Sequence, residues 1–253
     1  MSDKGHVIGV WSSLKGCGCT SSTSALVSSF FGKQGHSTLI LSSDVTSELN
    51  GPAMCSDIKQ TGSLDDLIML IKANGLTDIN EIKNYVVSVT KDLDVVKNGS
   101  SMSRDVEGFS LGVKTLIEKL RDLYDYVFID MENGLDGARC YIDNVDALII
   151  NIPQNMKVIE NYDQVRNLMD GKPVLLNIPF YIEYKHMDAK KMCKALGENG
   201  EVCVISVDED AHKAISGLYV SEFVYKLKPS KKNKMYRELM DIYSVISQVG
   251  KVE

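Results

Sequence analysis

The stretch Lys15-Gly16-Cys17-Gly18-Cys19-Thr20-Ser21 decides the fold of this chain. It follows an apolar run, Val7-Ile8-Gly9-Val10-Trp11, that predicts a buried strand, and it precedes a run of small and apolar residues, 22–31, that predicts a packed helix. Glycines between a strand and a helix let the backbone approach an anion, which successive N–H groups and the positive end of the helix attract. The stretch therefore predicts a phosphate-binding loop in an α/β protein.

The loop departs from the usual phosphate-binding pattern. That pattern, G-x-x-x-x-G-K-[ST], brings a lysine to the phosphates, and no Gly-Lys-Ser or Gly-Lys-Thr occurs in the chain. Taken alone, the loop is weak evidence for nucleotide binding, so the interpretation depends on the residues around it.

With its surroundings, the loop resembles that of the deviant Walker A family, the ParA and MinD ATPases, whose pattern is K-G-G-x-G-K-[ST]. In an ungapped alignment, Lys15 falls on the signature lysine, which in the family reaches across a dimer to the partner's nucleotide. Gly16 matches a family glycine, and Ser21 matches the hydroxyl that binds magnesium. The resemblance implies that the phosphates of ATP are bound by Lys15, Gly16, Cys17, Gly18, Cys19, Thr20, Ser21 and Ser22.

Three positions of the loop depart from the family. Cys17 and Cys19 stand where the family has glycines, and their Cβ atoms resist the positive φ angles that glycine tolerates. Thr20 stands where the family has its phosphate lysine, so the loop lacks a charged hydrogen bond of about 1.5–3 kcal/mol. We therefore expect nucleotide affinity to fall roughly ten- to a hundredfold on this contact alone, and hydrolysis to be impaired.

Two aspartates extend the resemblance to the ends of two further strands. The family's second strand ends in D-x-D; Ser42 departs from the first aspartate, while Asp44 matches the second, which positions magnesium and the attacking water. The run Tyr124-Asp125-Tyr126-Val127-Phe128-Ile129-Asp130 predicts an apolar strand that ends in a carboxylate, as the Walker B strand does. The resemblance implies that Ser21, Asp44 and Asp130 hold Mg²⁺ and that Lys15 and Asp44 act in catalysis.

Two more apolar runs, 145–151 and 173–177, predict strands that are covered on both faces, as parallel strands usually are. In the family, the asparagine that ends the latter strand contacts the adenine ring. The resemblance therefore implies that Asn177 binds the base.

A last strand and turn follow at 202–210, and they resemble the family's final strand with its I-P-x-D turn beside the base. Ser206 replaces the proline of that turn, and Val207 and Asp208 occupy the positions that face the base. The resemblance implies that Val207 and Asp208 belong to the nucleotide site.

The resemblance covers nearly all 253 residues, up to a closing helix within 229–248. It implies a P-loop NTPase-like α/β fold of the SIMIBI type, with a mostly parallel, twisted sheet of about seven or eight strands and helices on both faces. A chain of this length with 44% hydrophobic residues can bury one sizeable core. We therefore expect one nucleotide-binding domain over 1–253.

The segment between the second strand and the Walker B strand indicates a branch of the family. Its runs 62–68, 92–97 and 115–121 resemble the CpaE and TadZ proteins. These MinD-like proteins place Flp/Tad pilus machinery at a cell pole and often carry degenerate P-loops. This resemblance implies a protein partner at a pole or at a pilus or secretion complex.

Charge and hydropathy constrain the partners and the compartment. A net charge of −6 gives no general attraction to nucleic acid or anionic lipid, although both stay open as partners. The basic stretch 226–234 predicts a solvated turn and helix start, with a DNA or partner surface as the alternative. The sequence begins without a signal peptide and lacks an apolar stretch of ~20 residues, so we expect a cytoplasmic protein, placed at a pole or membrane only through its partners.

The cysteines and the last helix each allow two interpretations. The six cysteines contain no C-x-x-C pair, which favours reduced thiols in small packing sites over a metal cluster. A redox-sensitive loop stays open for Cys17 and Cys19. Apolar residues recur along 235–249 and predict packing on the sheet rather than an amphipathic membrane helix.

Two functions from different classes follow. In the first, the chain is a weak ATPase in which ATP and Mg²⁺ close a sandwich homodimer, and hydrolysis reopens it so that a pilus complex, plasmid or division component is positioned. In the second, it is a non-hydrolysing scaffold that localises partners. The missing lysine favours the second, while Lys15, Asp44 and Asp130 favour the first. A small-molecule enzyme related to dethiobiotin synthetase is disfavoured because such enzymes need the phosphate lysine.

Overall fold

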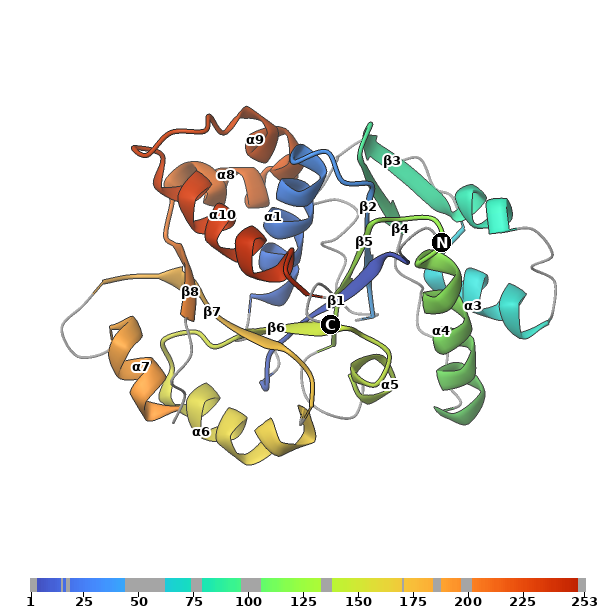
Figure 1. Cartoon of the computed structure of the whole chain (residues 1–253), viewed down its shortest axis with the longest axis horizontal. Coiled ribbons are helices and arrows are strands. Elements are labelled where there is room, and N and C mark those ends of the chain that lie inside the picture. Colours follow the sequence, from blue (N-terminus) through green and yellow to red (C-terminus); the bar gives the residue numbers. More distant parts are fainter. Residues whose placement is uncertain are drawn as a thin grey trace.

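The computed structural model describes residues 4–14, 16, 19–43, 62–73, 79–96, 106–132, 138–169, 171–183, 188–196 and 202–249. Its strands form one eight-stranded sheet in the order β3-β4-β2-β5-β1-β6-β7-β8 (Figure 1). Every neighbouring pair is parallel except β3 with β4. The strands are β1 (His6–Trp11), β2 (Thr38–Ser42), β3 (Val86–Thr90), β4 (Leu93–Val96), β5 (Tyr126–Asp130), β6 (Ala147–Asn151), β7 (Val174–Tyr181) and β8 (Val202–Ser206). The mostly parallel α/β sheet that the sequence predicts is confirmed.

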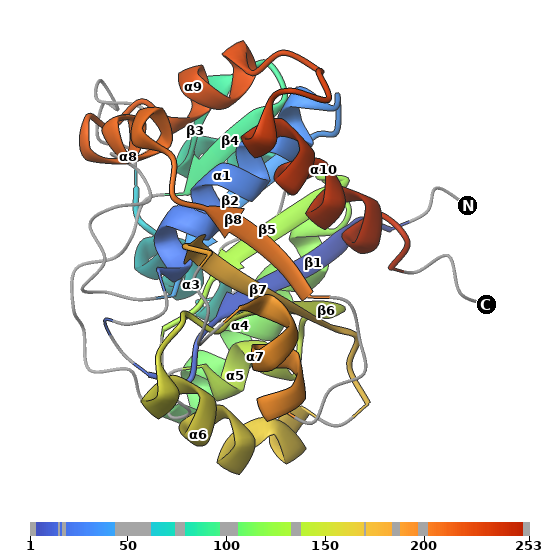
Figure 2. The same cartoon turned by 90° about the vertical axis from the view of Figure 1, so that its left-hand side faces the viewer.

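Helices cover both faces of this sheet (Figure 2). One face carries α1 (Thr20–Lys33), α8 (Glu209–Ser216), α9 (Val220–Lys226) and α10 (Lys234–Ile246). The opposite face carries α3 (Leu64–Lys72), α4 (Val106–Leu120), α5 (Arg139–Ile142), α6 (Met156–Val165) and α7 (Ala189–Ala195), with the 3₁₀ helices η1 (Ile79–Tyr85) and η2 (Arg166–Met169).

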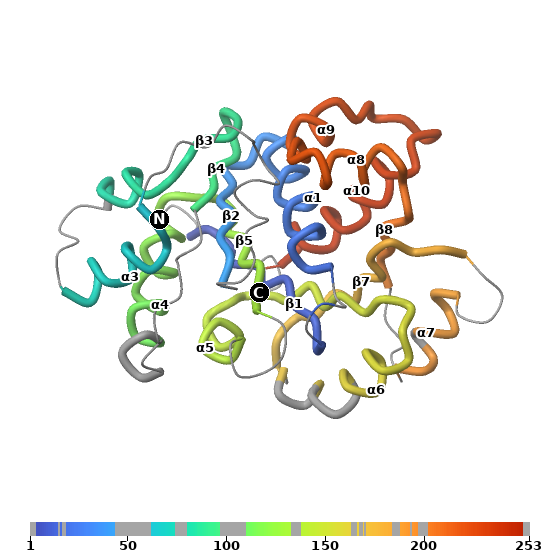
Figure 3. Tube along the Cα trace, turned by 180° about the vertical axis from the view of Figure 1, so that it is seen from behind, coloured from blue at the N-terminus to red at the C-terminus, as the bar shows by residue number. Residues whose placement is uncertain are grey.

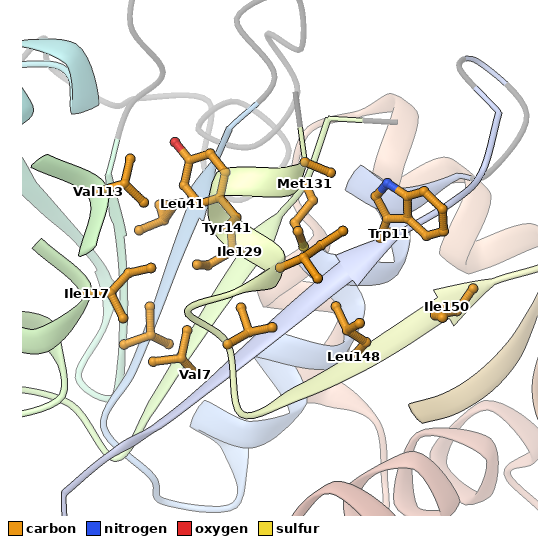
Figure 4. Packing of buried hydrophobic residues seen from close by; sticks show 14 of the residues in the cluster. Val7, Trp11, Leu41, Val113, Ile117, Ile129, Met131, Tyr141, Leu148 and Ile150 are labelled. Carbon is orange, nitrogen blue, oxygen red and sulfur yellow. The ribbon is translucent and has the colours of Figure 1, made fainter. Parts of the chain in front are cut away.

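The central strands are mostly apolar because both of their faces are covered, and their polar residues, such as Ser42, Asp130 and Asn151, stand at strand ends. Every residue of β2, β5 and β6 is buried. On the α3–α7 side, Val7, Trp11, Leu41 and Ile129 pack with side chains of α4 and α5 in one cluster (Figure 4). The apolar runs in the sequence thus correspond to strands that are buried on both faces in the structure.

The helix α10 packs on the face of the sheet that α1 also covers. Its buried residues include Met235, Leu239 and Ile242. Tyr243 contributes to an aromatic cluster on α1, where its ring centroid lies 4.9 Å from that of Phe31. This apolar face is thus used in the core, as the sequence predicts. Among the described residues, no helix has the length and apolar character needed to cross a membrane.

The helix α1 is held by its neighbours on this face, beside α9 and α10 (Figure 3). Lys33, in its last turn, donates from Nζ to the carbonyl oxygens of Val224 and Tyr225, each at 3.0 Å, and to that of Leu227. These carbonyls lie in the last turn of α9 and just after it, where carbonyl oxygens lack some of their helical partners; that of Val224 also accepts from Leu227 N at 3.1 Å. Burial lowers the pKa of Lys33. The α1 helix is thereby fixed at its carboxyl end.

Candidate functional site

The candidate site lies where β1, β2 and β5 end and α1 begins. In the ladders of the sheet, Asp130 at the end of β5 pairs with Val10 of β1 on one side and with Ser42 of β2 on the other. Asp130 is only 1% exposed. The sheet order thus brings the carboxylate predicted from the Walker B run to the strand that precedes the loop.

Two hydroxyl groups converge on one oxygen of this carboxylate. Ser21 Oγ, in the first turn of α1, donates to Asp130 Oδ2 at 2.7 Å, across 109 residues of sequence. Ser42 Oγ lies 3.3 Å from the same oxygen. The structure therefore brings Ser21 and Asp130 together as the sequence analysis expects. It also adds Ser42, whose departure from the family aspartate gives a hydroxyl donor where a second carboxylate would repel Asp130.

The loop itself contains two left-handed residues among those described. Gly16 has φ +74°, and no atom lies within 4 Å of where a Cβ would be. Cys19 has φ 49° and ψ 34° immediately before α1, and its carbonyl accepts the first helical hydrogen bond, from Thr23 N at 3.0 Å. Cys19 therefore adopts a positive φ although its Cβ makes that conformation costly.

Replacing Cys19 with glycine should raise the free energy of unfolding by about 0.5–1 kcal/mol. The left-handed conformation costs a residue with a Cβ about 1–2 kcal/mol, and the greater freedom of glycine in the unfolded chain offsets part of that gain. Urea unfolding would measure the change. Cys19→Ala removes the thiol but keeps the Cβ, so it serves as the control; equal stability of the two variants would contradict the prediction.

Thr20 occupies the position of the missing lysine. It is the first residue of α1 and is 5% exposed, so its short side chain is enclosed. Ser21 and Ser22, which follow it, are half-buried. The structure thus gives this turn hydroxyl groups and backbone N–H groups, without a lysine ammonium from position 20.

On the other side of α1, three buried side chains form a hydrogen-bonded chain. Asn151 Nδ2 donates to Thr23 Oγ1 at 2.9 Å, and Asn177 Nδ2 donates to Asn151 Oδ1 at 2.8 Å. Asn177 is fully buried, and its Oδ1 has no hydrogen-bond partner among the described residues. The chain links α1 to β6 and β7, a connection that sequence reasoning missed because nothing local marks it.

The strand predicted to end at Asn177 continues to Tyr181. The extension follows from pairing with β8, which reaches from Leu176 to Tyr181 with a bulge after Pro179. Asn177 consequently lies in the middle of β7 rather than at its end. Its role at the base stays a prediction.

The predicted base turn directly follows β8. Val207 is exposed, and its N–H donates to Tyr181 O at 3.1 Å. Asp208 Oδ1 accepts from Ala211 N at 2.8 Å and so caps α8. The side chain of Asp208 therefore has a structural partner already, while Val207 presents its side chain to solvent.

Four predicted site residues, Lys15, Cys17, Gly18 and Asp44, lie outside the described residues. Their roles stay predictions. Within the described part of the chain, no group of three or more histidine, cysteine, aspartate or glutamate side chains is arranged to hold a metal ion.

Two surface hollows lie away from the strand ends, around the loop between α9 and α10. Their volumes are about 420 and 680 Å³. The loop contains the basic stretch, whose lysines are exposed, and Asn233 then caps α10 by accepting from Tyr236 N at 3.0 Å. This is the solvated turn and helix start that the sequence predicts.

A mostly parallel sheet whose first strand is followed by a glycine-containing loop and a buried helix defines the class as a P-loop NTPase-like α/β fold. The sequence matches no protein-family model and no curated protein. The fold, in contrast, matches solved MinD and ParA structures.

One similar structure is the septum site-determining protein MinD of Pyrococcus horikoshii with Mg-ADP, with a TM-score of 0.72, 16% identity, and coverage of 96% of this chain and 97% of that chain. A second is a ParA family ATPase of Chlorobium tepidum, with a TM-score of 0.70 and 16% identity, and coverage of 95% of this chain and 98% of that chain. A third is the ATP complex of a Cyanothece McdA variant, with a TM-score of 0.71 and 14% identity, and coverage of 97% of this chain and 98% of that chain. The chain therefore has the MinD/ParA fold over almost its whole length.

Proposed function

We propose that this chain is a MinD/ParA-like nucleotide-binding protein that binds ATP with Mg²⁺ and positions cellular machinery, with weak or impaired hydrolysis. The single observation that carries the proposal is the contact between Ser21 Oγ and Asp130 Oδ2. It joins the start of the loop helix to a buried carboxylate at the end of a neighbouring strand. Apolar packing alone gives no reason for that arrangement.

The donor set at this contact fits magnesium. Mg²⁺ prefers oxygen ligands and retains several waters, so it requires only one or two protein oxygens beside the phosphates. A serine hydroxyl and a carboxylate 2.7 Å apart can supply them. In the proposal, Ser21 and Asp130 hold Mg²⁺ together with Asp44, and the bound ion neutralises phosphate charge.

The proposed nucleotide is ATP. Two of the structures that share the fold contain Mg-ADP or ATP. Gly16, Cys19 and the first turn of α1 offer backbone N–H groups to phosphates, in a loop completed by Lys15, Cys17 and Gly18. Asn177 Oδ1 is an acceptor that would suit the amino group of adenine. Because Asn177 is fully buried, the base would reach it only after a rearrangement.

The proposed mechanism divides the roles between residues. Backbone groups and Thr20, Ser21 and Ser22 bind the phosphates, and Asp44 orients the attacking water. Lys15 crosses to the partner's phosphates in a homodimer and supplies part of the charge that Thr20 lacks. Val207 and Asp208 line the side of the site where the base binds. Hydrolysis is slow because the developing charge has no ammonium group from position 20.

The cellular role is proposed from the resemblance of the central segment. We infer that the chain belongs to the CpaE/TadZ-like branch and acts in the cytoplasm as one domain that recruits a partner at a pole or at a pilus or secretion complex. A specific observation favours a second candidate: Thr20 is enclosed and uncharged, which suits a scaffold that binds partners without turning ATP over.

Calorimetric titration with ATP, in the presence and absence of Mg²⁺, tests the proposal. The wild-type protein should bind ATP more tightly with Mg²⁺, whereas Ser21→Ala and Asp130→Asn should reduce that advantage about tenfold, since each removes one oxygen contact to the ion. Ser244→Ala, on the exposed face of α10, is the matched control for the serine change. Absence of binding by the wild-type protein at millimolar ATP would refute the proposal.

Following phosphate release in the same samples separates the two candidates. Slow release that depends on Asp44 identifies an ATPase, as an Asp44→Ala variant would show. Binding without release identifies the scaffold.

A further inference from the structure

The last helix of the chain places a buried carboxylate against the end of the last strand. Glu238, in the middle of α10, is 6% exposed. Its Oε2 accepts from the backbone N–H of Ser206 at 2.9 Å, and its Oε1 accepts from Ser206 Oγ at 2.6 Å. Ser206 is itself buried and is the last residue of β8. A single carboxylate therefore binds both donors of one residue.

Packing of α10 does not require a carboxylate at this position. The same helix face is otherwise apolar, with Met235, Leu239, Ile242 and Ile246 in the core. A buried carboxylate costs free energy unless hydrogen bonds compensate for the water it loses. Here two charge-assisted bonds do so, and Lys234 Nζ lies 3.9 Å from Oε1. The position is thus specialised for holding Ser206.

Ser206 needs such a partner because of its place in the sheet. The strand β8 is the last strand, so the N–H groups on its outer side have no neighbouring strand. The next residue, Val207, donates inward to Tyr181 O of β7, beyond the bulge in that strand. Ser206 donates outward to Glu238. The end of β8 is therefore held from both sides just before the turn begins.

That turn is the base side of the proposed nucleotide site. Val207 and Asp208 follow Ser206 directly, and Asp208 then caps α8. A shift of Ser206 would move Val207, because a peptide bond joins the two residues. It would also disturb the hydrogen bond from Val207 N to Tyr181 O. The position of the turn consequently depends on α10, which lies more than thirty residues away in sequence.

We infer that Glu238 is a positioning residue that sets the base-binding turn through Ser206. The inference rests on the proposed function, since it concerns the base side of the same site. Removing Glu238 should weaken the binding of the base and leave the binding of the phosphates unchanged, because Glu238 holds the end of β8, whereas Ser21 belongs to the first turn of α1 and Asp130 to the end of β5. The two halves of the ligand can thus be tested separately.

The experiment compares ATP with inorganic tripolyphosphate, each with Mg²⁺, by calorimetry. Glu238→Ala should lose about tenfold in affinity for ATP and keep its affinity for tripolyphosphate. Glu238→Gln retains one acceptor oxygen and should recover part of the loss, and it keeps the test valid if the alanine variant fails to fold. Asp241→Ala, an exposed acid on the same helix, is the control and should match the wild type.

The outcomes distinguish this inference from the proposed function. If the wild type binds ATP and the Glu238 variants bind it equally well, or lose ATP and tripolyphosphate alike, the positioning role is wrong while the proposed function stands. If the wild type binds neither ligand, the proposed function is wrong and the inference is overturned with it.

Discussion

Replacing Thr20 with lysine is expected to raise the affinity for Mg-ATP by about ten- to a hundredfold. The substitution restores a charged hydrogen bond to the phosphates, worth about 1.5–3 kcal/mol, at the start of the helix where the anion is expected. Thr20 is enclosed, so the lysine stem would pass along the packed first turn while its ammonium group reaches the loop. Calorimetric titration would measure the gain.

A charge-free variant of similar size controls for packing. Thr20→Met brings a long apolar side chain to the same position without an ammonium group, so it should not gain affinity. Equal affinities of the lysine and methionine variants would show that phosphates do not bind beside position 20, and that the loop serves the fold alone. Salt dependence adds a second readout, because only the lysine contact should weaken as ionic strength rises.

Replacing Asp146 with alanine is expected to lower the free energy of unfolding by about 2–3 kcal/mol. The carboxylate forms a two-pronged ion pair with Arg121, in which Nη2 lies 2.8 Å from Oδ1 and Nη1 binds Oδ2. Its Oδ2 also accepts from Val7 N at 2.8 Å. Breaking a buried pair costs about 3–5 kcal/mol, and partial exposure of both side chains reduces that figure.

Arg121 makes this pair part of a larger contact at the amino end of the sheet. It also donates to Gly5 O at 3.0 Å and to Asn144 O at 3.2 Å, so it joins the segments before β1 and β6 to the end of α4. Asp146 lies at the opposite end of the strands from Asp130. The affinity for ATP should therefore be unchanged under conditions in which the Asp146→Ala variant is fully folded.

Urea unfolding of Asp146→Ala against Asp122→Ala measures this contribution. Asp122 pairs with Lys4 at 3.9 Å on the exposed surface, where an ion pair contributes little, so its loss should cost less than about 0.5 kcal/mol. Similar losses for the two variants would mean that the Arg121 contact is not the main stabilising feature at this end of the sheet.

The sequence by itself determined the order of the elements and the class of the fold. Long apolar runs such as that ending at Asp130 indicate strands covered on both faces, since only such strands can do without polar residues. The small residues after the loop likewise indicate a buried helix, which α1 confirms. These signals are local, because burial and helix formation depend on residues a few positions apart. The boundaries were less certain, as the extension of β7 to Tyr181 shows.

Only the tertiary structure decided which of these residues meet. Ser21, Ser42 and Asp130 come from three elements, and the fold brings both hydroxyl oxygens within 3.3 Å of Asp130 Oδ2. The same holds for Glu238 with Ser206, whose partnership no periodicity could indicate. The left-handed Cys19 was not predicted either, because residue propensity argues against a positive φ there. The physical reason for the two long-range contacts is that they are set by strand register and by the packing of whole helices, which depend on every element of the fold at once.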